Sequence, residues 1–253
     1  MQKIAIISDI HGNLPALKAV IQDIKTVFQA DLIYCLGDLT DGAPWHNEVI
    51  DTIRELQIST IMGNHDERVA FNYEVFPLQK HSLEEQKARL KTITHTKNTI
   101  TDTNREFLSK LPESIRLKYQ DNCILLVHGS PNNNDEYIYE NCDENLLNNL
   151  FEQMNANVIV TGHTHLSYIR KVKTDEKGQN NLFINAGSVG RSKEINGGKA
   201  VYLWLTIDDQ QNKVHPILRK IDYNINETIS GIRNSDIPDF YADFLNETTN
   251  ANK

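Results

Sequence analysis

Long apolar runs are missing from this 253-residue sequence, and no stretch approaches the roughly 20 apolar residues that a membrane-spanning helix requires. We also expect no secretory leader, because the chain enters the short apolar run Ile4–Ile7 after only three residues. Cysteine is scarce: Cys35, Cys123 and Cys142 are an odd number without a close pair, which predicts structural thiols rather than disulfides. Free cysteines are typical of a reducing compartment. We therefore predict a soluble, cytoplasmic protein that does not contact a membrane.

Glycine and proline number only 12 and 7, which excludes collagen-like and wholly disordered chains. Positive charge is also scarce: the chain has 26 basic and 34 acidic residues, and its formal net charge is −8. Proteins that bind duplex nucleic acid neutralise phosphates with a basic surface, so we predict no duplex nucleic-acid partner. The deficit does not exclude phosphate chemistry at a local cationic site. A chain of this length can fold without disulfides or subunit contacts, and its oligomeric state stays open.

Short apolar runs alternate with helical patterns over the first two thirds of the chain, and strands dominate the rest. The predicted strands are Ile4–Ile7, Leu32–Leu36, Ser59–Met62, Ile115–Tyr119, Cys123–Val127, Val158–Thr161, Tyr168–Lys173, Leu182–Ala186, Ala200–Ile207 and Val214–Ile221. The predicted helices are Leu14–Phe28, Val49–Leu56, the interrupted segment 80–111, Asp143–Met154 and two short helices near the C-terminus. The alternation predicts an α/β fold with a mixed or two-sheet core. We assign residues 1–245 to a single domain and expect the polar segment 246–253 to be a disordered tail.

Polar residues gather where five of the predicted strands end. The five blocks are Asp9-Ile10-His11, Gly37-Asp38-Leu39-Thr40-Asp41-Gly42, Gly63-Asn64-His65-Asp66, His128-Gly129 and Gly162-His163-Thr164-His165. Open α/β sheets bind ligands beyond the carboxyl ends of their strands, so these loops can converge in space. Five of the nine histidines lie in them, a concentration that surface histidines would not show.

The side chains in these blocks are carboxylate, imidazole and one amide, with no thiolate. Such donors suit manganese, iron, zinc or nickel better than a thiolate-rich structural zinc site. In an extended chain, residues i and i+2 point the same way, so the Asp-x-His and His-x-His blocks can each aim two donors at one region. The glycines are expected to allow sharp turns and to leave room near a bound ion. Any one block alone would be explained as a turn or a helix cap, whereas all five together predict a metal site.

Together the five blocks resemble the calcineurin-like metallophosphoesterase superfamily. Its pattern is an Asp-x-His, a Gly-Asp-x-x-Asp, a Gly-Asn-His-Asp/Glu, a His after a strand and a Gly-His-x-His. The segment Asn185–Gly190 also resembles the Asn-Pro-Gly-Ser-Val-Gly segment of the small bacterial phosphodiesterase-like branch, with Ala186 in place of proline. The resemblance covers about residues 1–222. It implies a four-layer α/β/β/α sandwich of two mixed β-sheets flanked by helices.

The resemblance also implies a dinuclear metal centre, with manganese expected first and iron, zinc or nickel as alternatives. One ion would be held by Asp9, His11 and His165, the other by Asn64, His128 and His163, with Asp38 bridging both. A hydroxide between the ions would attack phosphorus. His65 would then protonate the departing oxygen, and Asp41 would orient the His65 imidazole.

The expected activity is hydrolysis of a small phosphodiester or nucleotide, with diesters preferred to monoesters. A dinucleoside polyphosphate hydrolase is the alternative within the same chemistry. A protein phosphatase is disfavoured because that branch has arginine where this chain has Gly42, and glutamate where it has Asp66. A non-catalytic metal-binding scaffold is disfavoured because His65 is present.

Candidate substrate contacts are Asn13 and Arg191, although each is equally explained as a capping or surface residue. Trp45 could stack on a base, but a partly buried position at a helix start explains it better. Tyr137 and Tyr139 follow His128 in a polar loop, and as candidate substrate contacts they rank below Trp45. The remaining histidines match no block and are assigned to the surface or to packing: His46, His81, His95 and His215.

Overall fold

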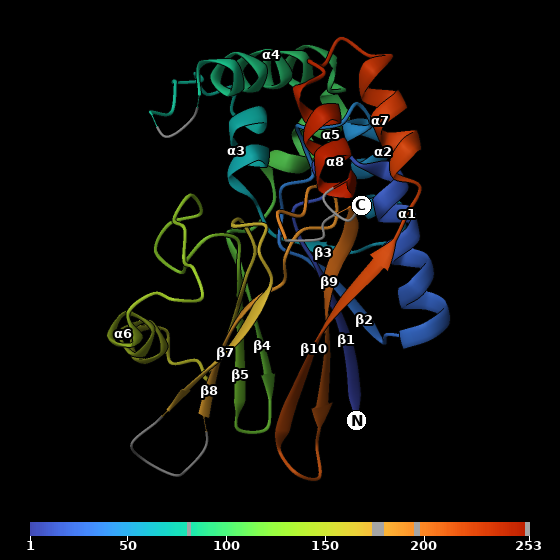
Figure 1. Cartoon of the computed structure of the whole chain (residues 1–253). Coiled ribbons are helices and arrows are strands. Elements are labelled where there is room, and N and C mark those ends of the chain that lie inside the picture. The colour runs from blue at the N-terminus through green and yellow to red at the C-terminus, as the bar shows by residue number, and fades with distance from the viewer. Residues whose placement is uncertain (80–81, 174–179, 195–197, 251–253) are drawn as a thin grey trace.

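Two five-stranded mixed sheets form the centre of the structure (Figure 1). The computed structural model describes residues 1–79, 82–173, 180–194 and 198–250. The first sheet has the order β10-β9-β1-β2-β3, with β1 at Gln2–Ile7, β2 at Leu32–Cys35, β3 at Ser59–Thr60, β9 at Lys199–Asp208 and β10 at Lys213–Asp222. The second has the order β4-β5-β6-β8-β7, with β4 at Ser114–Tyr119, β5 at Asn122–Val127, β6 at Val158–Thr161, β7 at Tyr168–Lys173 and β8 at Asn180–Asn185. Strands β1, β2 and β3 run parallel, as do β5, β6 and β8.

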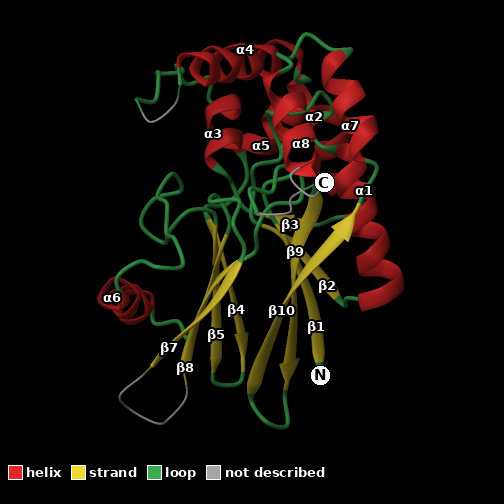
Figure 2. Ribbon diagram, in the orientation of Figure 1, coloured by secondary structure: helices red, strands yellow, loops and turns green. Residues whose placement is uncertain are grey.

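Helices cover the outer faces of the two sheets, which confirms the predicted α/β/β/α order (Figure 2). The first sheet is covered by α1 at Leu14–Asp23, its π-helical continuation at Ile24–Phe28, α2 at His46–Glu55 and α5 at Asp102–Ser109, and the second by α6 at Glu144–Met154. The remaining helices lie above the strands in Figure 1: α3 at Asn64–Ala70, α4 at Leu83–Thr99, α7 at Ile225–Arg233 and α8 at Phe240–Asn250. Among the described helices, none combines the length and the apolar character that crossing a membrane demands.

The core strands bury both of their faces, which explains their continuous apolar sequences. In β1, Ile4 and Ile6 pack in the space between the two sheets. Ala5 and Ile7 on the same strand face the helices that cover the first sheet. Strand β5 alternates in the same way between the other sheet and α6. The two sheets are therefore fixed against each other by one apolar layer, and their strand ends are held in register.

The structure differs from the predicted elements in three places. The helix predicted for Leu14–Phe28 changes to π-helix at Ile24 and ends where Gln29 adopts a left-handed backbone, with φ of 55°. Strand β3 is shorter than predicted, because the Met62 N–H leaves the sheet and donates to the Pro112 carbonyl oxygen. The short helix α3 was not predicted at all.

The last helix, α8, spans Phe240–Asn250. Tyr241, Ala242 and Leu245 are buried against α7, so the first turns of α8 are anchored to the domain. The assignment of residues 246–253 to a disordered tail stays a prediction. Residues 251–253 lie outside the described part of the chain.

Candidate metal centre

Five loops meet at one end of the two sheets. The loops after β1, β2 and β3 come from the first sheet, and those after β5 and β6 come from the second. They bring together all of the residues that the sequence predicts as metal ligands, and each of these side chains is buried. The two groups of facing side chains are the first cluster, Asp9, His11 and His165, and the second cluster, Asp38, Asn64, His128 and His163.

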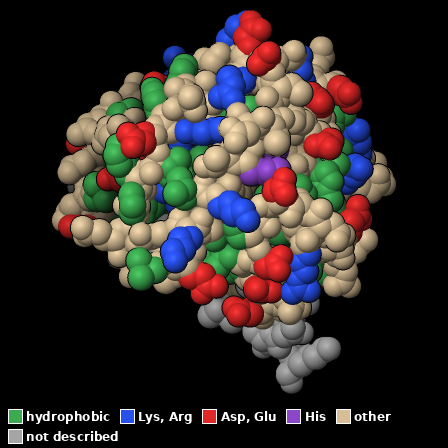
Figure 3. All heavy atoms as spheres, turned by 90° about the horizontal axis from the view of Figure 1, so that it is seen from above, with side chains coloured by type: hydrophobic (Ala, Val, Ile, Leu, Met, Phe, Trp, Pro, Cys, Tyr) green, Lys and Arg blue, Asp and Glu red, His purple; other side chains and the backbone are tan. Residues whose placement is uncertain are grey.

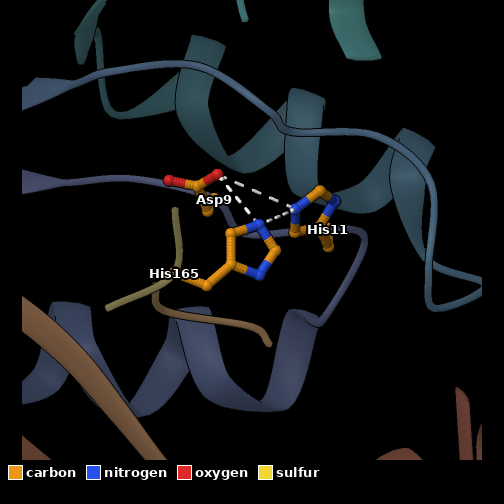
Figure 4. A group of neighbouring side chains, drawn as sticks. All are labelled: Asp9, His11 and His165. Carbon is orange, nitrogen blue, oxygen red and sulfur yellow. Dashed lines mark hydrogen bonds and ion pairs between the residues drawn. The ribbon is translucent and has the colours of Figure 1, made fainter. Parts of the chain in front are cut away.

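The first cluster is a triangle of one carboxylate and two imidazoles (Figure 4). Asp9 Oδ1 lies 3.2 Å from His165 Nε2 and 3.8 Å from His11 Nε2. The two Nε2 atoms are 3.0 Å apart. All three ligand atoms therefore face one small volume.

The second cluster lies next to the first, and the two are in contact through Asp38 and His11. Asp38 Oδ2 is 3.3 Å from His128 Nε2, which is 3.2 Å from Asn64 Oδ1. The same Asp38 oxygen is 3.8 Å from His11 Nε2 in the first cluster. Asp38, His128 and His163 also place their ligand atoms within 4.8 Å of one another. Asp38 thus stands between the two clusters, where the sequence predicts a bridging carboxylate.

Three atoms of these clusters have no hydrogen-bond partner among the described residues, although they are buried. They are Asp9 Oδ1, Asp38 Oδ2 and His163 Nε2. Buried polar atoms in folded proteins are almost always paired, and an isolated buried charge is especially unfavourable. Oxygen and nitrogen lone pairs that converge in this way fit divalent transition-metal ions. The residues present therefore fit the predicted cofactor.

Three of the imidazoles are oriented by main-chain carbonyls. The Nδ1–H group of His11 donates to Thr40 O at 3.1 Å, that of His128 to Leu36 O at 2.8 Å, and that of His165 to Arg191 O at 2.9 Å. A carbonyl oxygen can only accept, so each ring carries a proton on Nδ1 and turns its Nε2 atom to the centre. Such bonds fix ring orientation and tautomer in metal sites.

Burial sets the protonation of the first cluster. It lowers the pKa of His11 well below the usual range, and the neighbouring His165 adds to this effect. Burial likewise lowers the pKa of His165 itself. Although burial opposes ionisation of Asp9, the adjacent His165 lowers the pKa of that carboxyl. Neutral imidazoles around an ionised carboxylate are the ligand forms that metal binding requires.

The second cluster is more strongly coupled. Burial lowers the pKa of His163 to about 3, with a further contribution from His128. For His128, burial opposes the charged form, but the Asp38 carboxylate outweighs it and raises the pKa to about 10. The extra proton on His128 balances the negative charge of Asp38. A metal cation beside Asp38 would balance that charge instead. Binding a metal here should therefore release a proton.

His65 and Asp41 form a pair at the edge of the clusters. His65 Nδ1 lies 2.7 Å from Asp41 Oδ2, and the His65 backbone N–H donates to Asp38 Oδ1 at 2.9 Å. Although burial opposes ionisation, the hydrogen bond from His65 lowers the pKa of Asp41. The His65 side chain is 18% exposed, whereas the side chains of the clusters are almost wholly buried. His65 is therefore more exposed than the imidazoles of the two clusters, although His163 and His165 line the same cavity.

The backbone at the centre is left-handed, which sequence spacing did not reveal. Of the twelve non-glycine residues with positive φ in the described chain, six belong to the site: Asp9, His11, Asp38, Asp41, His163 and His165. This conformation costs an L-residue about 1–2 kcal/mol. Backbone bonds between loops hold it, including those from the N–H groups of Asp9 and His11 to Gly37 O and Asp38 O. The i, i+2 side chains converge, but not through the extended chain that was expected.

Two glycines make room for ligand carboxylates rather than for the ion itself. A Cβ at Gly63 would lie 2.2 Å from Asp38 Oδ1, and a Cβ at Gly162 would lie 2.5 Å from Asp9 Oδ2. Neither glycine has a positive φ. Their role is close approach of one loop to another, not a sharp turn.

A profile of the calcineurin-like phosphoesterase family matches residues 2–167. The chain belongs to this family. It is 30% identical over 257 residues to the uncharacterized protein MJ0912 of Methanocaldococcus jannaschii, with 96% of both chains covered.

Two solved structures share the fold of this calcineurin-like phosphoesterase. A metallophosphoesterase from Sphaerobacter thermophilus has 24% sequence identity and a TM-score of 0.74, with 98% of this chain and 99% of that chain covered. The hypothetical protein PH1004 from Pyrococcus horikoshii OT3 has 22% identity and a TM-score of 0.77, with 97% and 98% covered. The family is that of metal-dependent phosphoester hydrolases, and the two clusters are its candidate metal ligands here.

The predicted substrate contacts behave differently from one another. Asn13 caps α1 by accepting the Ala16 N–H, and its amide donates to Gly190 O, so the structure favours the capping alternative. The Arg191 side chain lines the cavity that opens onto His65 and the clusters. Trp45 precedes α2 and packs against α7 at Gly231, which agrees with the helix-start explanation.

Tyr137, to which the sequence gives a low rank as a substrate contact, is one of the residues that line the cavity. The ring of Tyr137 lies 4.0 Å from that of His163 and lines the same cavity as His65. Nothing in its sequence neighbourhood marks it, because it lies in an irregular loop after β5. Of the unassigned histidines, His46 is buried, which agrees with packing, and His81 lies outside the described residues.

Asp66 has a role that the motif alone did not specify. Its buried carboxylate accepts the N–H groups of Asp38 at 2.7 Å, Leu39 at 2.9 Å and Gly63 at 3.2 Å. Burial and the nearby Asp38 charge raise the pKa of Asp66 to about 7, whereas these donors favour its ionised form. Asp66 thus ties the loop after β2 to the start of α3.

We expect Asp66→Ala to lower the free energy of unfolding of the metal-free protein by roughly 3 kcal/mol, because each buried N–H left unpaired costs about 1–3 kcal/mol. Metal affinity should fall about 10- to 100-fold, as for other residues that orient metal ligands. Urea titration and metal binding by calorimetry measure the two effects. Asp51→Ala, at an exposed position on α2, is the control. Unchanged stability and affinity would show that the loop does not depend on Asp66.

Proposed function

We propose that this calcineurin-like phosphoesterase uses two metal ions to hydrolyse a small phosphodiester or nucleotide. The observation that carries the proposal is the sharing of Asp38 by two ligand clusters, with His65 directly beside them. One carboxylate between two sets of donors is the arrangement that two neighbouring cations need. Manganese is the first candidate because the donors are carboxylate, imidazole and amide.

Two bound divalent ions would lower the pKa of water and neutralise charge that develops on the phosphoryl oxygens. The chain's own residues would do the rest. Asp41 holds His65 Nδ1, so the Nε2 atom of that ring is left to carry a proton toward the cavity. His65 would deliver this proton to the departing oxygen of the substrate. Asp38 would at the same time hold the His65 main chain through its Oδ1 atom.

The test compares a diester with a monoester. Metal-free protein is loaded with manganese, iron, zinc or nickel and assayed with bis(4-nitrophenyl) phosphate and 4-nitrophenyl phosphate. We expect hydrolysis with at least one metal, a faster reaction with the diester, and loss of activity after chelation. Metal binding without hydrolysis of either ester would indicate a scaffold and overturn the proposal. A faster monoester reaction would overturn the substrate class but not the chemistry.

A further inference from the structure

Three arginines from separate elements line the cavity in front of the metal clusters. Arg68 lies on α3, Arg89 on α4 and Arg191 in the loop after β8. None of the three forms an ion pair with a carboxylate within 4 Å in the described part of the chain. Lys193 lines the same cavity. Basic side chains are therefore gathered here in a protein whose net charge is −8.

Two of these arginines bury donors that have no acceptor. Arg68 Nη1 and Arg191 Nε are inaccessible to solvent, and neither donates to any described residue. Unpaired buried donors are rare in folded proteins and call for an explanation. Both side chains line one small cavity of about 60 Å³, so a small anion held there is the candidate for the missing acceptor.

The guanidinium groups are held in place by other contacts. The Arg191 guanidinium carbon lies 4.5 Å from the centre of the Tyr241 ring and 5.4 Å from that of Phe244. Arg89 Nη1 donates to Phe76 O at 3.0 Å. Burial lowers the pKa of Arg89, and the Arg68 guanidinium adds to this effect, so the two cations are near enough to repel each other. Like charges held close together without counter-ions are typical of a site for a multiply charged anion.

Three carboxylates also line the cavity, and they offset part of the positive charge of the three arginines and Lys193. Asp38 belongs to the second cluster, and Asp135 accepts the amide N–H of the ligand Asn64 at 3.1 Å. Glu85 lies on α4. On the face of the molecule seen in Figure 3, basic and acidic side chains are interspersed rather than gathered into one broad basic patch. The charge is thus local, which fits a small anion better than a long polyanion.

The position of the arginines relative to His65 indicates which part of the substrate would carry the anionic group. Arg68 follows His65 by three residues on α3, so the two side chains lie on the same face of that helix. Under the proposed function, His65 faces the departing oxygen. A group bound by Arg68 and its neighbours would therefore belong to the leaving group, and not to the part that stays on phosphorus.

We propose that Arg68, Arg89 and Arg191 form a second anion subsite, and that the substrate carries a further phosphate on its leaving group. This inference rests on the proposed function. Water supplies the oxygen that bonds to phosphorus, the bond from phosphorus to the leaving oxygen breaks, and His65 gives that oxygen its proton. The further phosphate is not cleaved. It is either an ester phosphate on a leaving nucleoside or a phosphate joined to the scissile one through an anhydride.

Binding is tested first, without metal and without turnover. Inorganic tripolyphosphate is titrated by calorimetry into protein freed of metal by chelation and dialysis. We expect Arg89→Gln and Arg191→Gln each to weaken its binding by about tenfold or more, because each removes a charged donor. Lys87→Gln removes the same charge from an exposed position on α4 and should change the affinity by less than about twofold. Arg89→Lys should restore part of the loss.

Equal losses in the arginine and lysine variants would show a long-range charge effect and overturn the subsite, as would no loss in the arginine variants. Arg191→Gln keeps the test valid if Arg89→Gln fails to fold.

Turnover then locates the phosphate. The metal-loaded protein is assayed with the dinucleotide TpT, with its 5′-phosphorylated and 3′-phosphorylated forms, and with a dinucleoside triphosphate. We expect the form whose leaving nucleoside carries the phosphate to exceed TpT in kcat/KM, and Arg191→Gln to reduce this ratio. A faster reaction of the triphosphate would identify the anhydride instead. If TpT is cleaved and no phosphorylated form is faster, the inference fails alone; if nothing is cleaved with any metal, the proposed function fails.

Discussion

Replacing Asp38 by Asn should reduce kcat/KM by about 10³-fold or more, because under the proposed function the shared carboxylate would support two cations that are together worth several kcal/mol of transition-state stabilisation. Asn keeps the shape of the side chain and the oxygen that accepts the His65 N–H, so the fold should persist. The charge between the clusters is what disappears. We expect the variant to bind fewer metal ions than the wild type, as measured by elemental analysis after dialysis.

The matched control is Asp51→Asn, an identical change at an exposed position on α2. It should leave activity and metal content within about twofold of the wild type, as surface substitutions usually do. Full metal content and full activity in Asp38→Asn would show that the two clusters do not depend on a shared carboxylate. Circular dichroism of the variant separates this result from loss of structure.

Replacing His65 by Ala should lower kcat by about 10²- to 10⁴-fold, the usual contribution of a general acid, while metal content stays nearly unchanged. The reason is that the motif assigns no metal to His65 and its Nδ1 atom is held by Asp41. One of its ring nitrogens nevertheless lies within 4.8 Å of the ligand atoms of His11 and Asp38, so the metal content of the variant is the decisive measurement. The loss should be smaller for a nitrophenyl ester, whose leaving group departs without protonation, than for a dinucleotide. Comparing the two substrates measures proton donation directly.

His215→Ala serves as the control for this experiment, because His215 lies on β10 and in none of the five loops. It should behave like the wild type with both substrates. Loss of metal in His65→Ala would instead make His65 a structural residue. An equal loss with both substrates would argue against a role as proton donor.

The fold was predictable where strands are apolar on both faces. The run Ile4–Ile7 gave a clear signal because its side chains enter two different cores. The short strand β3 and helix α3 gave weaker signals. The Met62 N–H bonds to Pro112 O, 50 residues away, instead of continuing the sheet, and α3 begins at Asn64, a candidate ligand. Where a segment's partners are distant in sequence, local pattern cannot place its ends.

The convergence of the candidate ligands was predictable because each residue lies in a compact motif after a strand. The parts of the site that were not predicted lie outside any such motif. Three histidine rings are oriented by main-chain carbonyls, which every residue possesses. Arg68 and Arg89 lie on helices whose sequences look like ordinary charged faces, and only the folded cavity shows that they face His65. Tyr137 was ranked low for the same reason.

The bonds from imidazole Nδ1 to carbonyl oxygen also tie the chain together. Each joins the loop of one strand to that of another: His11 to the loop after β2, His128 in the second sheet to the end of β2 in the first, and His165 to the loop after β8. These rings are cross-links as well as candidate ligands. Chelation should therefore leave the cross-links in place, whereas truncating one of these histidines would remove a candidate donor and a tie between distant segments at once.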